Sequence, residues 1–98
     1  MSSPPGVGVF VTITNPLPNA SVSQIFTVSG SFGPPGGTLT IETDDGSGIA
    51  TGPTINGSDY SFKLKNVNFG TRTVTVTLDA GGQGSASASV TVTVTPDT

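Results

Sequence analysis

The chain of 98 residues contains no cysteine, no histidine and no tryptophan. Without cysteine it forms neither a disulfide nor a thiolate metal site, and the cysteine count does not report the redox compartment. Without histidine and cysteine, neither a Ser-His-Asp triad nor a Cys-His pair can be assembled. The imidazole base and the thiol on which these two arrangements depend are therefore absent from this sequence.

Charged side chains are also scarce, at 9% of the residues against about 25% in a typical soluble domain. Three basic and six acidic side chains give a formal net charge of −3. Nucleic acids and anionic membrane surfaces are bound through clusters of basic residues, and the sequence has no such cluster. No apolar run is long enough to cross a bilayer. We therefore expect neither nucleic-acid binding nor membrane insertion.

What the sequence does contain is regular alternation, most clearly in its last third. Two runs of valine, leucine or alanine alternating with threonine or serine flank a glycine-rich turn at residues 79–84. Successive side chains of a strand point to opposite faces, so each run has one apolar and one hydroxylated face. Placing Leu78 opposite Ala86 in a hairpin also places Val74 opposite Val90. Both apolar rows then lie on one side, which predicts the core face of a sheet.

The earlier part of the chain repeats this pattern in shorter segments, with proline and glycine at the breaks. No segment shows helical periodicity over three turns. Short alternating strands at this spacing predict an all-β, two-sheet antiparallel Greek-key sandwich of about seven strands. A closed barrel would give the same pattern. The expected strands are residues 9–14, 24–32, 38–42, 49–55, 60–65, 73–78 and 85–95, of which 49–55 has the weakest signal.

The strands form one domain, expected to span residues 9–95. Residues 1–8 are rich in serine, proline and glycine. We expect them to be a linker, or residues left over from excising the domain from a longer protein. Residues 96–98 return to linker composition. Within the domain, Asn56-Gly57 suits a tight two-residue hairpin turn. Tyr60 shares its phase with Phe62 and is expected in the core.

Two stretches resemble bacterial immunoglobulin-like modules. Residues 13–22 form a strand and a proline-containing corner, and the run Phe26-Thr27-Val28-Ser29-Gly30 follows. The segment from Gly70 to Val76 and the closing Ser/Ala/Val/Thr strand are similar to the last two strands of that family. The Asn-Pro-Leu-Pro-Asn corner is also similar to the immunoglobulin-like domain attached to some spore-germination proteins, so both subfamilies stay open.

The resemblance implies an immunoglobulin-like sandwich that serves as a spacer or adhesion module, often repeated, in a larger secreted or cell-surface bacterial protein. Its partners would be the neighbouring domains of the parent chain. The family brings no catalytic residues, and we expect no enzymatic activity and no cofactor. The alternative is an accessory module that binds carbohydrate or calcium beside an extracellular enzyme.

Calcium binds to carboxylate, amide and backbone oxygens, and four side chains at expected strand ends offer such oxygens. The sequence around Asp44 lacks the ligand spacing of an EF-hand loop, so turn formation is the simpler interpretation. A carboxylate pair for glycoside cleavage would have to come from Glu42, Asp44, Asp45, Asp59 or Asp79. The calcium candidates are Asp44, Asp45, Asp79 and Asn15.

Two further surfaces are candidates for binding. Phe10 and Phe69 fall outside the core phase and are the candidate aromatic contacts for a sugar. The hydroxyl-rich strand faces are candidates for contact with a protein partner, because uncharged strands guard poorly against edge pairing. Solvated threonine, favoured by its strand propensity, is the simpler interpretation. These faces comprise Thr73, Thr75, Thr77, Ser87, Ser89, Thr91 and Thr93.

Overall fold

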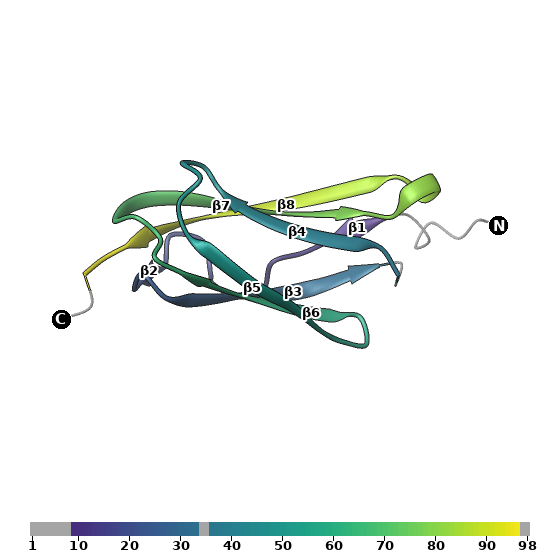
Figure 1. Cartoon of the computed structure of the whole chain (residues 1–98), viewed down its shortest axis with the longest axis horizontal. Coiled ribbons are helices and arrows are strands. Elements are labelled where there is room, and N and C mark those ends of the chain that lie inside the picture. The colour runs from purple at the N-terminus through teal and green to yellow at the C-terminus, as the bar shows by residue number, and fades with distance from the viewer. Residues whose placement is uncertain (1–8, 34–35, 97–98) are drawn as a thin grey trace.

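The computed structural model describes residues 9–33 and 36–96, so the linker predicted at residues 1–8 lies outside the described part. Two four-stranded sheets face each other across the core (Figure 1). The first contains, in spatial order, β1 (Phe10–Val11), β3 (Phe26–Gly33), β6 (Asp59–Lys65) and β5 (Ile49–Asn56). The second contains β2 (Ser21–Val22), β8 (Ser85–Val94), β7 (Gly70–Asp79) and β4 (Thr38–Thr43).

The strand order is that of an immunoglobulin-like sandwich. In that fold, the first, second, fifth and fourth strands form one sheet, and the third, sixth and seventh form the other. Here β3, β6 and β5 take the second, fifth and fourth positions, and β4, β7 and β8 take the third, sixth and seventh. The first strand is divided between the sheets as β1 and β2 (Figure 1). The predicted two-sheet sandwich is confirmed, and the strands do not close into a barrel.

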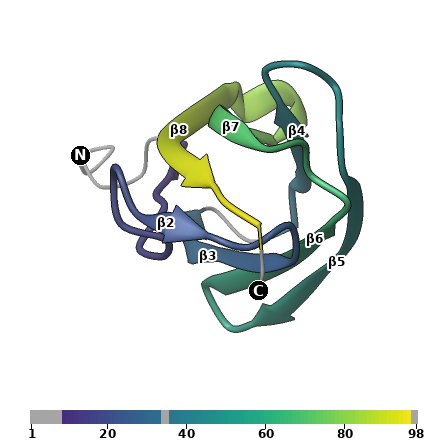
Figure 2. The same cartoon turned by 90° about the vertical axis from the view of Figure 1, so that its left-hand side faces the viewer.

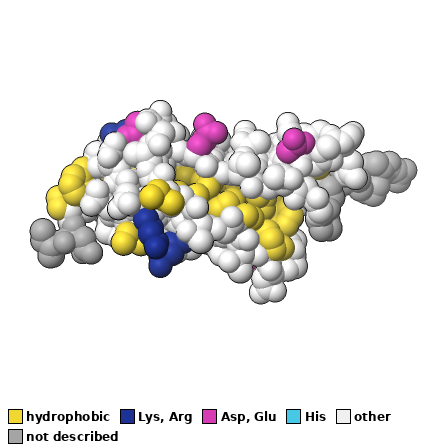
Figure 3. Space-filling view, viewed as in Figure 1, with side chains coloured by type: hydrophobic (Ala, Val, Ile, Leu, Met, Phe, Trp, Pro, Cys, Tyr) yellow, Lys and Arg dark blue, Asp and Glu magenta, His cyan; other side chains and the backbone are white. Residues whose placement is uncertain are grey.

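The hairpin of β7 and β8 has the predicted register. Leu78 pairs with Ala86, and Val74 pairs with Val90. The apolar row of β7 faces the opposite sheet and is fully buried. The hydroxyl row faces outward, where Thr73 bonds to Thr91 across the strands at 3.2 Å. Figure 3 shows how sparse charged side chains are on one side of the molecule.

The core fills the space between the sheets and ends in an aromatic cluster. The ring centroids of Phe32 and Tyr60 are 6.2 Å apart, and those of Tyr60 and Phe62 are 5.9 Å apart, both edge to face. Such pairs add to the free energy that burial itself contributes. Tyr60 is 2% exposed, which confirms its predicted place. The other buried apolar residues are Val11, Val28, Leu39, Leu64, Val67, Val74, Val76, Leu78, Val90, Val92 and Val94.

Gly30 allows the hydroxyl of Tyr60 to reach the first strand. This hydroxyl donates to the backbone carbonyl of Thr12 at 2.6 Å, and burial raises the pKa of Tyr60 to about 12. A Cβ atom on Gly30 would lie only 1.9 Å from the Thr12 oxygen and 3.0 Å from the Tyr60 hydroxyl. The chain of residues 9–14 therefore departs from a regular ladder, and β1 ends at Val11, short of the predicted strand.

The weakly predicted strand at residues 49–55 exists as β5, which pairs with β6 alone and lies at the edge of its sheet. Its register shifts between Thr51 and Thr54, around Gly52 and Pro53. A proline and an irregular register both hinder the pairing of a further strand with the edge of a sheet.

The turn between β5 and β6 differs by one position from the prediction. Asn56 pairs with Asp59, so Gly57 and Ser58 form the two-residue turn in place of Asn56-Gly57. Gly57 has a φ of 66°, whereas Ser58 has no positive φ. A glycine with positive φ at the first central position is typical of a type II′ turn, which does not need a second residue of positive φ.

The sandwich is long and narrow, with principal-axis extents of 53 × 22 × 22 Å. Val9 lies near Gly84, which precedes β8, and the described chain leaves just after the far end of that strand. We call the first end the amino-terminal pole; it contains Phe10, Asp59 and the turn at residues 79–84. We call the opposite end the carboxy-terminal pole; it contains residues 22–25, 66–69 and 95–96 (Figure 1). The described residues contain no helix with the length and apolar character of a membrane span.

Candidate functional site

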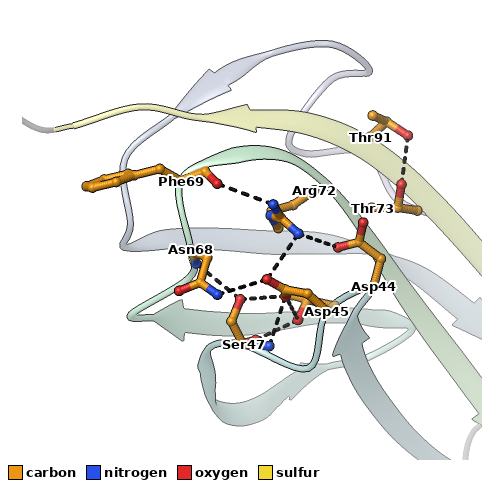
Figure 4. Close-up of polar contacts among 9 residues, drawn as sticks. Asp44, Asp45, Ser47, Asn68, Phe69, Arg72, Thr73 and Thr91 are labelled. Atoms are coloured by element: carbon orange, nitrogen blue, oxygen red, sulfur yellow. Dashed lines mark hydrogen bonds and ion pairs between the residues drawn. The ribbon is translucent and has the colours of Figure 1, made fainter.

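The densest polar contacts of the described chain lie near the carboxy-terminal pole, where the β4–β5 loop meets the β6–β7 loop (Figure 4). The β4–β5 loop turns at Gly46 and Gly48, whose φ angles are 76° and 94°. Within it, one carboxylate oxygen of Asp45 accepts from the Ser47 N–H at 2.9 Å and from the Ser47 hydroxyl at 2.7 Å. The first of these bonds closes the local turn that aspartate favours.

The second carboxylate oxygen of Asp45 reaches two other segments. It accepts from the Asn68 side-chain amide at 2.9 Å and pairs with the Arg72 guanidinium at 3.0 Å. Arg72 also contacts Asp44 at 3.4 Å and donates to the Phe69 carbonyl at 3.3 Å. The cluster thus connects the loop after β4 and the loop before β7 to Arg72, near the beginning of β7.

Hydrogen bonds set the electrostatics of this cluster. The side-chain and backbone bonds from Ser47 hold the pKa of Asp45 well below its usual range, and Asn68 and Arg72 act in the same direction. Partial burial opposes the shift. Because both of its oxygens already accept from protein donors, the carboxylate of Asp45 acts as a structural acceptor. The Arg72 Nε atom is buried, with no hydrogen-bond partner among the described residues.

Asp45→Asn is expected to lower the melting temperature by several degrees at pH 7. A carboxylate whose native pKa is depressed stabilises the fold above its ordinary pKa of about 3.9, and that stabilisation is lost as the pH falls toward the native value. The difference between the variant and the parent protein should therefore shrink below about pH 4. Thermal unfolding followed by circular dichroism between pH 7 and pH 2.5 measures this. Asp59→Asn, at an exposed position of the hairpin turn, is the control and should leave the profile unchanged. An Asp45→Asn gap that is constant across the range would contradict the prediction.

The structure does not bring the calcium candidates together. Asp44 and Asp45 lie beside the Arg72 guanidinium. Asp79 lies at the amino-terminal pole, where it accepts from the Gly81 N–H at 2.9 Å. Asn15 pairs with Ser29, away from both poles. In residues 9–33 and 36–96, no three acidic side chains are grouped as metal ligands would be.

The two candidate aromatic contacts are also far apart. Phe10 is 43% exposed at the amino-terminal pole, and its ring lies over Gly33, where a Cβ atom would be 2.6 Å from the ring. Phe69 is 50% exposed at the carboxy-terminal pole. They therefore cannot form one platform for a sugar ring. The outward hydroxyls of β7 and β8 are partly paired with each other, as in the bond of 3.2 Å between Thr75 and Ser89.

The carboxylates considered for glycoside cleavage are spread over the molecule. Glu42 stands on the outer face of β4 opposite Thr75, and Asp59 lies in the β5–β6 hairpin. The sequence interpretation missed the role of Arg72, although a signal was present. Arg72 has the same phase as Val74 in β7, so a charged side chain stands at the end of an inward-facing row. Such a residue is expected to have an acidic partner, because isolated charges are rarely buried.

No protein-family model matches the chain, and no curated protein matches it. Among solved structures, it is similar to one described as the crystal structure of the S-layer protein SbsC domains 4 and 5. The likeness has a TM-score of 0.57 and 15% sequence identity, over 86% of this chain. The chain corresponds to 50% of the length of that protein fragment. At this identity, the likeness shows a shared fold.

Proposed function

We propose that the chain is a non-catalytic spacer module of the bacterial immunoglobulin-like type, within a larger secreted or cell-surface protein. The observation that carries the proposal is the position of its ends. The described chain begins at one pole and ends at the other, along a body with a longest extent of 53 Å. A module of this geometry adds length to a chain each time it is repeated.

The likeness to part of an S-layer protein supports a surface location for the parent protein. The composition agrees with this role, because threonine and serine cover the outer face of β7 and β8 without adding charge. The contacts of Arg72 and Asp45 would serve this role by holding two loops in place at one pole. The partners of the module would be its neighbours in the chain, with no cofactor.

The spacer function is tested by joining two copies through their own terminal segments. The joined protein should scatter X-rays as an elongated particle, with a maximum dimension near twice that of one copy. This result is expected because the chain leaves each copy at the end opposite to its start, and because proline-containing linkers are semi-extended. A compact profile, with the copies side by side, would contradict the proposal. That outcome would favour lateral contact through the Thr/Ser faces.

A further inference from the structure

We infer that the carboxy-terminal pole is a head-to-tail contact surface, and that its occupant is the amino-terminal pole of a second copy placed next in the same chain. This inference rests on the proposed spacer function and names the partner within it. Head-to-tail contacts between unlike surfaces generate extended arrays, because the array always keeps one unused surface at each of its ends.

The first argument is the position of the pole relative to the departing chain. The Thr95 N–H donates to the Val22 carbonyl at 2.8 Å. The Gln24 side chain donates to the Val67 carbonyl at 3.1 Å, and the Val67 N–H donates back to Gln24 at 3.3 Å. These bonds gather three distant segments around the point where the chain departs (Figure 2). A domain joined here is held at a high effective concentration against this surface.

The second argument is the apolar surface beside that point. Ile25 follows Gln24 and is 52% exposed, and Phe69, two residues after Val67, is 50% exposed. In Figure 4, the ring of Phe69 points away from the Arg72 cluster. Two large apolar side chains are thus exposed on two segments of the carboxy-terminal pole. The facing surface of a second copy would carry Phe10, which is 43% exposed.

The third argument is charge, which is distributed unevenly along the molecule. The chain has only three basic residues. Arg72 is already paired with Asp44 and Asp45. Lys65 ends β6 beside the carboxy-terminal pole, and Lys63 lies two residues before it. Figure 3 shows the basic side chains toward this end of the molecule.

The amino-terminal pole has the opposite sign. It carries Asp59 and Asp79, and none of the three basic residues lies there. A head-to-tail arrangement therefore brings the lysines of one copy toward carboxylates of the next, whereas contact between two like poles would oppose equal charges. Complementary charge of this kind selects orientation more than it adds affinity. The neighbour that fits best is thus another copy in the same direction.

The test compares one copy with two copies joined through their own terminal segments. The first copy should melt about 4 °C or more higher when joined, since its exposed apolar side chains become covered. Ile25→Ser with Phe69→Ser in the first copy should abolish this gain. The gain of the substituted protein is measured against a single copy with the same pair of substitutions, because about half of each side chain is covered within one copy. Ile55→Ser in the first copy is the matched control, at 49% exposure on β5, and should preserve the gain.

Charge is tested by Lys65→Glu in the first copy, which should reduce the gain at low salt by facing carboxylates of the second copy. Equal melting temperatures of the single and joined proteins would overturn the inference, as would a gain that survives the double substitution. X-ray scattering of the same joined protein separates the two proposals. An elongated particle with no gain in melting temperature would be consistent with the spacer function but would contradict the head-to-tail contact. A compact particle would contradict the spacer function itself.

Discussion

Val76→Asp is expected to abolish the cooperative thermal unfolding of the domain. Val76 is 0% exposed at the centre of β7, where it pairs with Ile41 on one side and Ala88 on the other. The sequence offers no basic residue in this apolar row except Arg72, which is already paired. An unpaired carboxylate there must be protonated or must open the core. The cost should be about 4 kcal/mol or more, a large share of the stability of a small domain.

Thr77→Asp is the matched control for this substitution. Thr77 is the next residue of the same strand and faces outward between Thr40 and Ser87, which are uncharged. The carboxylate would remain in water, and the change in melting temperature should be small. Circular dichroism and differential scanning calorimetry of the two variants measure the difference. Equal losses of stability in both variants would mean that the two faces of β7 have been assigned wrongly.

Gly30→Ala is expected to destabilise the domain by about 3 kcal/mol, although it adds a single methyl group. The added Cβ would lie 1.9 Å from the Thr12 carbonyl oxygen and 2.7 Å from its carbon. Because both atoms belong to the backbone, no side-chain rotation relieves the overlap. The first strand must move away, and the bond from Tyr60 to Thr12 must lengthen or break. The loss of that bond leaves a buried hydroxyl without its partner, which adds to the cost.

The control for Gly30→Ala is Gly82→Ala in the turn before β8. A Cβ atom on Gly82 would have no neighbour within 4 Å, and its φ is not positive. Urea unfolding of both variants gives the free energies of unfolding. Amide hydrogen exchange would locate the change, with protection lost first in residues 10–15. A Gly30→Ala variant as stable as the Gly82→Ala variant would show that the first strand adjusts at no cost.

The parts of the fold that could be predicted are those with one buried face. In β7 and β8, alternation identifies the inward row, and the hairpin then fixes the register of Val74 against Val90. A shift of one residue would turn every valine toward water, so the pattern allows one solution. The same reasoning placed Tyr60 in the core.

Other elements have only a weak pattern in the sequence. Every residue of β5 except Pro53 is exposed, and β5 lies at the edge of its sheet. With no buried row, it has no strong alternation to detect. The two residues of β2 are placed beside β8 by backbone bonds, which any sequence can make. The shifted turn at Gly57 also reflects pairing with β6 and not the residue types of the turn alone.

The polar cluster shows the same limit for side chains. Asp44 and Asp45 were interpreted as turn residues, and the bonds within the loop agree with that interpretation. Their partner Arg72 lies on another strand, and its distance from Asp45 depends on the pairing of β4 with β7. The phase of Arg72 within β7 was a signal that it needs an acidic partner, and the sequence interpretation missed it. That signal did not indicate which of the six acids would be the partner.

The division of the first strand between the two sheets also determines how the module would carry a pulling force. β2 runs parallel to β8, and backbone bonds join residues 19–22 to residues 91–95, including Asn19 N–H to the Thr91 carbonyl at 2.7 Å and Thr93 N–H to the Ala20 carbonyl at 2.8 Å. Tension between the two poles would draw β2 and β8 in opposite directions along their common axis. These bonds would then bear the load together in shear, whereas bonds at the open end of a hairpin break one after another. A chain of such modules would resist stretching until this short parallel pair gave way.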